Sequence, residues 1–291
     1  MKRLLIIDGH NLLFQMFFGF PVKLYNSKGK MYQGVLGFVG ALLKIIKMTN
    51  PTHVVVLFDS EKRTVRSDIY EEYKSNRIDY NLVEEQDNPF SQLEDIFKSL
   101  DCLSIKYKEI ETYETDDVIA SYVYRYKDDC EIFISSFDSD FFQLIDENVK
   151  VLRYRGDNSV ICDEEYLKKK YFIEPNTYSL FKSLVGDSAD NIKGVKGIGP
   201  KTASEIVNIC HTFDELKEKY KELCKKRVIG ILENSFELIK QNLELIELND
   251  EAPIPYTIEE VEYINKNMTT NMILSKIGIK CRVVNDVRPK R

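Results

Sequence analysis

Three short apolar runs, each followed by aspartate, constrain the fold of this chain more than any other feature of its sequence. None of them alternates polar with apolar residues, which is typical of parallel strands that are buried on both faces. The runs and the acids after them are Leu4–Ile7 with Asp8, Val54–Phe58 with Asp59, and Ile132–Ile134 with Asp138 and Asp140. Because the carboxyl ends of parallel strands lie at one edge of a sheet, where ligands bind in open α/β folds, we expect these carboxylates to meet there.

The spacing of apolar residues between the runs predicts helices that cover this sheet. Residues 35–46 and 93–100 carry apolar side chains every three or four positions, and Val149–Leu152 has the pattern of a further strand. Alternating strands and helices are typical of the α/β class, with a central, mostly parallel sheet flanked by helices. Beyond about Glu164 the pattern is helical only, and it continues to Leu248. We therefore expect an α/β core over 1–163, a helical region over 164–250 and a C-terminal extension over 251–291.

The composition limits the classes of protein to which the chain can belong. With 43% hydrophobic residues among 291, the chain can bury a substantial core. No segment has the roughly 18 uninterrupted apolar residues of a membrane span, and the N-terminus reaches Asp8 too soon for a signal peptide. The six cysteines are far apart in the sequence, which fits free thiols in a reducing cytoplasm rather than disulfides or zinc ligands.

Two further groups of acidic residues extend the carboxylate cluster. Glu114 and Asp117 share one face at the start of a predicted helix, with Asp116 between them, and Asp187 and Asp190 follow a later helix. Taken singly, each group is explained as well by cap and turn chemistry. With the strand-end acids they make nine carboxylates, and such a cluster without His or Cys selects hard divalent ions, Mg²⁺ or Mn²⁺. Two such ions about 4 Å apart suit the hydrolysis of a phosphodiester.

A glycine-rich block predicts a helix–hairpin–helix over residues 192–207. Such a turn presents backbone N–H groups at a helix N-terminus, where a DNA phosphate can bind. The lysines around it add positive charge, and Pro200 suits the first turn of the second helix. A turn with a structural role alone is the alternative interpretation. The residues that we expect to contact DNA are Lys193, Lys196, Gly197, Gly199, Lys201 and Thr202.

With these motifs, the chain resembles the bacterial 5′→3′ exonucleases, which include the flap-endonuclease-like N-terminal domain of DNA polymerase I and its free-standing relatives. The resemblance covers nearly all of residues 3–250 and rests on six blocks in a fixed order. The blocks are IIDGHNLLF, VVLFDS, a basic stretch with Arg66, Tyr73, Lys74 and Arg77, TYETDDVIAS, FDSD followed by QL, and GDSADNIKGVKGIGPKTA. The resemblance implies a PIN-like 5′ nuclease core, a helical arch over residues 61–88 and a helix–three-turn–helix that grips duplex DNA.

Carried over residue by residue, the resemblance assigns roles to individual side chains. The metal-binding acids would be Asp8, Asp59, Glu114, Asp116, Asp117, Asp138, Asp140, Asp187 and Asp190. From the arch, Lys74 and Arg77 would stabilise the charge on the scissile phosphate, while Arg66 and Tyr73 would contact DNA. The implied cofactor is two or more Mg²⁺ ions, for which Mn²⁺ can substitute, with K⁺ as a candidate at the hairpin.

Two residues depart from the family pattern. Gln15 stands where relatives commonly have Arg, and Ser139 stands where they commonly have Lys between the two acids of the third strand motif. Neither change removes a metal ligand. We therefore expect altered DNA affinity rather than lost catalysis.

The resemblance implies a Mg²⁺-dependent, structure-specific 5′→3′ exonuclease and flap endonuclease that acts in replication and repair. Its partners would be nicked or branched DNA with a 5′ flap or an RNA primer, and we expect a cytoplasmic, nucleoid-associated monomer without a polymerase domain or a membrane partner. Two alternatives stay open: a non-catalytic protein that binds DNA junctions, and a PIN-like ribonuclease, although such ribonucleases are shorter and lack the helix–hairpin–helix. The net charge of −6 does not oppose DNA binding, since it becomes +3 without the nine acids.

Overall fold

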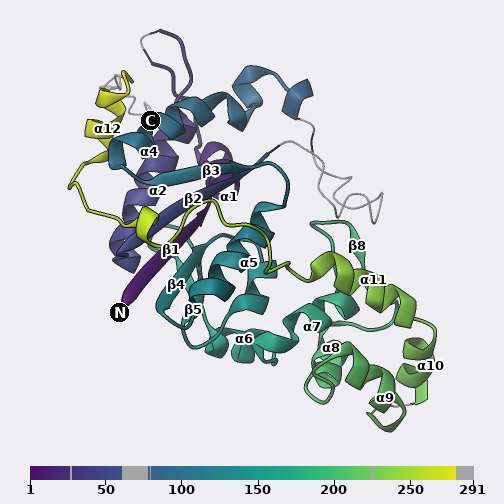
Figure 1. The fold of residues 1–291 in the computed structure, drawn as a ribbon. Helices are drawn as coiled ribbons and strands as arrows, with labels where there is room; N and C mark the ends of the chain where they lie inside the picture. The colour runs from purple at the N-terminus through teal and green to yellow at the C-terminus, as the bar shows by residue number, and fades with distance from the viewer. Residues whose placement is uncertain (27, 61–77, 79, 224–225, 280–291) are drawn as a thin grey trace.

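The computed structural model describes residues 1–26, 28–60, 78, 80–223 and 226–279 and contains a six-stranded sheet with helices on both faces (Figure 1). Neighbouring strands are parallel, except that the last pair is antiparallel. In spatial order the strands are β3 (Lys106–Ile110), β2 (His53–Asp59), β1 (Lys2–Asp8), β4 (Cys130–Ser135), β5 (Val149–Arg153) and β6 (Val160–Cys162). The predicted fold class is confirmed, and all four predicted strands are present.

Six helices lie against the sheet or extend its layers, and short 3₁₀ turns connect several of them. The helices are α1 (Gly9–Gly19), α2 (Gln33–Thr49), α4 (Leu93–Leu103), α5 (Thr115–Tyr126), α6 (Glu164–Lys170) and α12 (Thr270–Lys276). The 3₁₀ turns are η1 (Tyr80–Leu82), η2 (Glu85–Asp87), η3 (Pro89–Gln92), η4 (Asp140–Leu144), η5 (Pro175–Thr177) and η6 (Glu259–Val261). Residues 61–77 and 79 of the predicted arch lie outside the described part of the chain.

The hydrophobic core has two halves, one on each face of the sheet. In β1, Leu4 and Ile6 pack with α5 and the helical region, whereas Leu5 and Ile7 pack with α1, α2 and α4. All four side chains are fully buried. Successive residues of a strand point to opposite faces, so a strand that is covered on both sides needs an unbroken apolar run. This explains why the sequence pattern is continuous.

The sequence did not predict the two edge strands. β3 has the sequence KYKEI, and of its five residues only Ile110 is buried; β6 likewise buries only Cys162. Edge strands are commonly polar, because charge on an edge opposes pairing with another chain. Their sequences therefore lack the pattern that marked the central strands.

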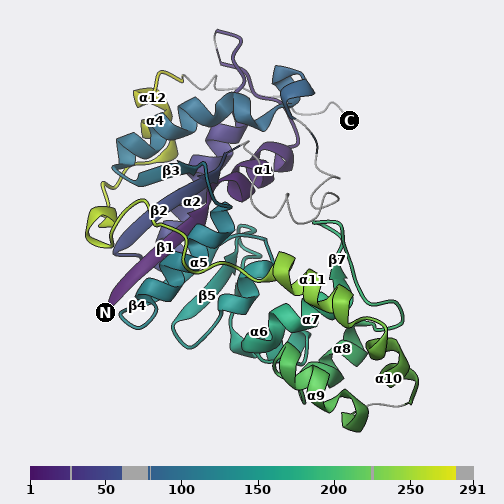
Figure 2. The same ribbon diagram turned by 45° about the vertical axis from the view of Figure 1, so that its right-hand side comes forward.

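The helical region lies to one side of the sheet, beyond β5 and α6, at the lower right of Figure 2. It contains α7 (Tyr178–Val185), a short hairpin of β7 (Gly186–Asp187) and β8 (Ile192–Lys193), then α8 (Pro200–Val207), α9 (Phe213–Leu223), α10 (Lys226–Glu233) and α11 (Phe236–Ile246). The continuous register predicted up to Leu248 is wrong in detail. The helix is interrupted at Asn234 and Ser235, whose side chains bond back to the carbonyls of Gly230 and Ile231.

The C-terminal extension returns to the sheet and packs on the helices of its far side. The backbone N–H of Tyr263 donates to the carbonyl of Thr52 at 2.8 Å, and Glu262 forms a bridge with His53. Farther on, Ile273 and Leu274 of α12 are buried in the core half that contains α2 and α4. Residues 280–291 of the predicted C-terminal extension lie outside the described part of the chain. Within the described ones, no helix is both long enough and apolar enough to span a membrane.

Gly194 and Gly186 allow the backbone after α7 to pass close to itself. A Cβ on Gly194 would lie 2.2 Å from the carbonyl oxygen of Val185, and one on Gly186 would lie 2.3 Å from the backbone nitrogen of Gly194. We predict that Gly194→Ala lowers the free energy of unfolding by about 3 kcal/mol, because the clash is with backbone that cannot rotate away. Urea denaturation measures this change.

Gly199→Ala is the matched control, since a Cβ there meets no atom within 4 Å. Because glycine is moderately favoured over alanine at an N-cap, the control should cost about 1 kcal/mol or less. Equal losses in the two variants would contradict the account of Gly194.

Candidate metal centre

The ends of β1 and β2 bring Asp8 and Asp59 to the same edge of the sheet. Asp8 caps α1 by accepting the N–H of Asn11 at 3.1 Å, and its other carboxylate oxygen accepts the hydroxyl of Ser136 at 2.8 Å. Asp59 accepts the N–H of Thr115 at 3.0 Å and so caps α5 from a different element. The carboxylate accepts one of the free N–H groups at the N-terminus of α5, and this contact holds the start of the helix at the strand ends.

The turn after β4 positions Asp138 and Asp140. The N–H of Asp140 donates to a carboxylate oxygen of Asp138 at 2.8 Å, and the N–H of Asp138 donates to the hydroxyl of Ser136 at 3.0 Å. Ser136 therefore connects this turn to Asp8. The Asp138 carboxylate also adds to the negative potential at both Asp8 and Asp140. Strand-end acids that are far apart in the sequence thus form one electrostatic unit.

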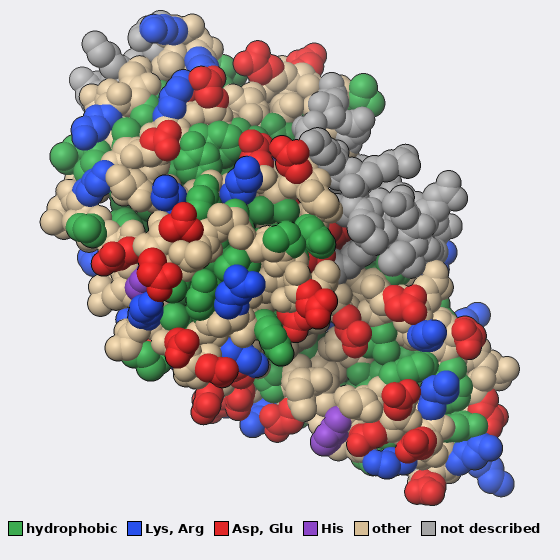
Figure 3. All heavy atoms as spheres, in the orientation of Figure 1, with side chains coloured by type: hydrophobic (Ala, Val, Ile, Leu, Met, Phe, Trp, Pro, Cys, Tyr) green, Lys and Arg blue, Asp and Glu red, His purple; other side chains and the backbone are tan. Residues whose placement is uncertain are grey.

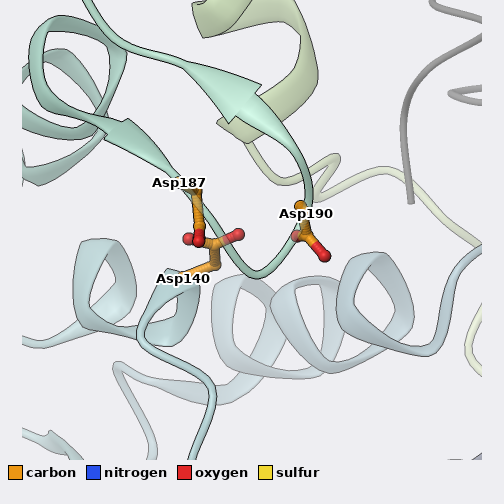
Figure 4. A group of neighbouring side chains, drawn as sticks. All are labelled: Asp140, Asp187 and Asp190. Atoms are coloured by element: carbon orange, nitrogen blue, oxygen red, sulfur yellow. The ribbon is translucent and has the colours of Figure 1, made fainter. Parts of the chain in front are cut away.

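Asp140, Asp187 and Asp190 form the tightest carboxylate group in the described part of the chain. One oxygen from each can be chosen so that all three lie within 4.8 Å of one another. Asp140 comes from η4, and the other two come from the β7–β8 hairpin and its turn; Asp140 and Asp187 point toward one another, with Asp190 beside them (Figure 4). The separation suits a single cation that is shared by several oxygens.

Lys182 of α7 places a positive charge in this group. Its ammonium donates to the carboxylates of both Asp140 and Asp187, and to the hydroxyl of Ser139 at 3.4 Å. The residue is only 5% exposed. Burial opposes its charge, but Asp140 and Asp187 outweigh that effect and raise the pKa of Lys182 above its ordinary value. The ammonium is therefore a fixed cation of the site.

Burial and mutual repulsion disfavour the charged form of the central carboxylates. Burial, followed by the neighbouring charge of Asp59, raises the pKa of Asp8 to about 7. Burial also raises the pKa of Asp140 to about 7, although Lys182 acts in the opposite direction. At Asp187, which is less buried, Lys182 prevails over burial and the pKa is lowered. A cation that binds among these carboxylates stabilises their charged form. The donor set therefore fits a hard divalent ion.

The structure brings the nine predicted acids together to different degrees. Glu114 and Asp117 are buried at the start of α5 and Asp116 is half-buried there. The Asp117 carboxylate accepts the N–H of Asn249 at 2.9 Å. In the part of the chain that the structure describes, the tight group does not include these three acids, Asp8, Asp59 or Asp138.

The two departures from the family pattern have structural explanations. The Gln15 side chain donates to the carbonyl of Tyr154 at 2.5 Å, so it connects α1 to the end of β5. Ser139 lies beside Lys182, as described above, so a lysine from α7 supplies positive charge next to the acid turn.

The predicted DNA-contact residues of the hairpin lie on the surface. Lys193, Lys196 and Lys201 are exposed, as are Gly197 and Gly199, and Thr202 is half-buried. Gly197 has a φ of +94°, which favours glycine, whereas Gly199 has a φ of −99° and is the N-cap of α8. Arg66, Tyr73, Lys74 and Arg77 lie outside the described residues. Over the face drawn in Figure 3, basic side chains are interspersed with acidic ones.

Sequence reasoning missed Lys182, and a signal for it was available. Tyr178, Phe181 and Val185 mark the apolar face of α7, and Lys182 is on the same face, four residues after Tyr178. A lysine on a buried face needs a charged partner. The acids that follow in the sequence supply one.

Comparison with protein families gives two successive matches. Residues 3–172 match the 5′-3′ exonuclease N-terminal resolvase-like domain, and residues 173–269 match the 5′-3′ exonuclease C-terminal SAM fold. A 5′-3′ exonuclease of Aquifex aeolicus is 33% identical over 261 residues, which are 86% of this chain and 86% of that protein. DNA polymerase I of Bacillus subtilis is 32% identical over 290 residues, 95% of this chain. The chain spans about a third of the length of that polymerase, 32%.

Solved structures share the fold. The bacteriophage T5 flap endonuclease, in a pseudo-enzyme–product complex with DNA and metal ions, gives a TM-score of 0.67 at 25% identity, covering 85% of this chain and 90% of that chain. Human GEN1 in complex with Holliday-junction DNA gives a TM-score of 0.54 at 14% identity, covering 94% of this chain and 66% of that chain.

We predict that Lys182→Met destabilises the chain in EDTA by about 3 kcal/mol, because it leaves buried carboxylates without their cation. Added Mg²⁺ should recover part of this loss. Thermal denaturation with EDTA and with Mg²⁺ measures both effects. The control is Lys150→Met, which breaks a 2.9 Å ion pair with Glu131. Because the Lys150 side chain is 29% exposed, this variant should lower the free energy of unfolding by less than about 1 kcal/mol. Equal stability of Lys182→Met and wild type in EDTA would refute the prediction.

A second prediction concerns pH. Because the folded-state pKa of Asp8 is about 7, the unfolded chain holds fewer protons between about pH 4 and 7, and metal-free stability should fall as pH rises through that window. Asp8→Asn removes this contribution and keeps an acceptor for Asn11. It should stabilise the chain in EDTA by about 2 kcal/mol at pH 8 and leave it unchanged near pH 4.

Asp163→Asn is the control for this measurement, because Asp163 caps α6 by accepting the N–H of Tyr166 at 2.9 Å in the same way. This variant should shift stability by about 0.5 kcal/mol or less at either pH, as Asn and Asp are similar caps. If Asp8→Asn were destabilising at pH 8 in EDTA, the account of the buried carboxylate would be wrong.

Proposed function

The chain belongs to the 5′-3′ exonuclease family, and on that premise we propose that it is a structure-specific 5′ nuclease. It would hydrolyse phosphodiester bonds near the 5′ ends of nicked or flapped DNA and of RNA primers, in replication and repair. One observation carries the proposal: buried carboxylates from separate strands, a helix and a hairpin converge, and burial raises the pKa of Asp8 and Asp140 to about 7. Such a cluster lowers the free energy of unfolding of the metal-free chain. Its presence is explained if the carboxylates bind a cation.

The cofactor in this proposal is Mg²⁺, with Mn²⁺ as a substitute. Asp140, Asp187 and Asp190 would hold one ion, since one carboxylate oxygen from each lies within 4.8 Å of the other two. Asp8, Asp59, Glu114, Asp116, Asp117 and Asp138 would complete the site directly or through water. Bound in this way, the ions would activate water and stabilise charge on the leaving oxygen.

The protein's own cations would act beside these acids. Lys182 keeps Asp140 and Asp187 oriented and reduces the repulsion that an incoming phosphate meets. Lys74 and Arg77, in the predicted arch, would stabilise the charge of the scissile phosphate. Lys193, Lys196 and Lys201 are exposed near the glycine turn and would bind duplex phosphates, with K⁺ as a candidate ion at the turn.

Further parts of the proposal concern DNA contacts and assembly. Arg66 and Tyr73 would contact the DNA from the arch, as would Gly197, Gly199 and Thr202 through the turn. We propose that the protein acts as a monomer on the bacterial chromosome in the cytoplasm. The three parts 1–163, 164–250 and 251–291 would serve as nuclease core, duplex clamp and C-terminal extension.

The main alternative is a protein that binds DNA junctions without cutting them. Such a protein needs the exposed lysines but gains nothing from buried acids of raised pKa. A PIN-like ribonuclease needs the acids but not the helical region with its glycine turn. The nuclease proposal accounts for both features.

We predict that wild type cleaves a labelled 5′-flap duplex in Mg²⁺ and that Asp138→Ala and Asp138→Asn lose about 10²-fold or more of the rate. Asp138→Asn is the sharper test. Its side-chain oxygen can still accept the N–H of Asp140, a bond that the Asp138 carboxylate makes at 2.8 Å in the wild-type chain. Single-turnover cleavage with a Mg²⁺ titration gives the rates. If wild type binds the flap and never cuts it, the enzyme proposal fails.

Asp146→Asn is the matched control. Asp146 also accepts N–H groups in a turn, from Asn148 at 2.8 Å and Val149 at 2.9 Å, but it precedes β5 at the opposite edge of the sheet. Its rate should stay within about twofold of wild type, since surface changes away from a site are usually small.

A further inference from the structure

The segment that follows α11 contacts two of the elements that carry the acids. Ile246–Asn249, called the brace here, runs from the end of α11 toward the C-terminal extension. It bonds both to the turn after β4 and to the first turn of α5. These elements contribute Asp140 and Asp117, which are 23 residues apart in the sequence, so one short segment fixes their relative position.

Gln143 makes the first connection, using three hydrogen bonds from a half-buried side chain. Its amide nitrogen donates to the carbonyl of Asp140 at 2.8 Å and to the carbonyl of Ile246 at 3.1 Å. Its amide oxygen accepts the N–H of Leu248 at 3.1 Å. The side chain thus uses both amide protons and its acceptor, and it joins the acid turn to the brace.

Asn249 makes the second connection. Its N–H donates to a carboxylate oxygen of Asp117 at 2.9 Å, and its carbonyl accepts the hydroxyl of Ser121 at 3.5 Å. One oxygen of a buried carboxylate is therefore fixed by the brace. Asp117 cannot rotate freely without losing this bond.

The same helix reaches the hairpin that carries the remaining acids. The Asn242 side chain of α11 donates to the carbonyls of Ser183 at 2.8 Å and Lys193 at 2.9 Å. Lys193 is in β8, which pairs with β7 next to Asp187. Together, α11 and the brace therefore contact three elements that carry acids or pair with a strand that does: the turn after β4, the start of α5 and the β7–β8 hairpin.

We propose that Gln143 is a positioning residue of the metal centre, which sets the distance between Asp140 and Asp117 through the brace. The inference rests on the proposed function for the identity of the cation. Like charges repel one another, so hydrogen bonds to the surrounding structure are needed to hold them at the spacing that a cation needs. Gln143 supplies such bonds without adding charge.

The experiment compares Gln143→Leu with Tyr122→Phe. The first variant removes all three bonds at similar volume. The second removes a hydroxyl that donates to the carbonyl of Tyr256 at 2.9 Å and accepts its N–H at 3.2 Å. Both variants therefore remove hydrogen bonds to the part of the chain that begins with the end of α11, but Tyr122→Phe leaves the bonds of the acids and the brace intact.

Mn²⁺ affinity of the DNA-free chain, measured by calorimetry, is the main readout. Gln143→Leu should weaken it about 10- to 100-fold, as is usual when a residue that orients metal ligands is lost. Tyr122→Phe should stay within about twofold. Binding of flap DNA in EDTA should be unchanged in both variants, since neither touches the exposed lysines. Mn²⁺ affinity equal to wild type in Gln143→Leu, or an equal loss in Tyr122→Phe, would overturn the proposal.

A measurement on wild type covers the case in which Gln143→Leu does not fold. In hydrogen exchange, saturating Mg²⁺ should protect the amides of Leu248 and Asn249 more than the amide of Tyr256. Unchanged protection at the first two would also overturn the proposal.

The outcomes separate the two proposals. If wild type binds Mn²⁺ but does not cut flap DNA, the proposed function fails, and the metal affinities still decide the role of Gln143. If wild type binds no Mn²⁺, both proposals fail together.

Discussion

Repulsion among desolvated carboxylates is the constraint on which the rest of this structure depends. Parallel strands deliver Asp8, Asp59 and the Asp138–Asp140 turn to one edge, and the β7–β8 hairpin adds further acids there. Each unpaired charge that leaves water costs several kcal/mol in a protein interior. The raised pKa values of Asp8 and Asp140 express that unfavourable term. The fold must therefore neutralise, hydrogen-bond or fix each carboxylate.

The chain meets this constraint with three kinds of contact. N–H groups at helix N-termini donate to two of the carboxylates, since Asp8 caps α1 and Asp59 caps α5. The buried ammonium of Lys182 neutralises part of the charge between η4 and the hairpin. Backbone N–H groups, including that of Asn249, fix further oxygens. Since these contacts come from the sheet, α5, α7 and the segment after α11, the acids tie the helical region to the sheet.

The sequence predicted what depends on local pattern and missed what depends on distant contacts. Central strands and strand-end acids were readable because burial on both faces forces an unbroken apolar run, as in β1 and β2. The edge strand β3 carries no such run, and the break before α11 follows from side-chain bonds of Asn234 and Ser235. Gln143 was visible as part of a motif, but its role depends on Ile246 and Leu248, about 100 residues later. No spacing rule connects residues so far apart.

The placement of Lys182 shows why the metal-free fold can hold these acids at all. A lysine that bridges Asp140 and Asp187 supplies one positive charge, whereas a divalent ion supplies two and offers more coordination positions. One charge among several carboxylates leaves a net negative site, which favours entry of a cation. Full neutralisation by further lysines would stabilise the fold but remove that attraction. The negative charge of the site is therefore only partly neutralised in the metal-free chain. The binding of a divalent ion would relieve the repulsion that remains.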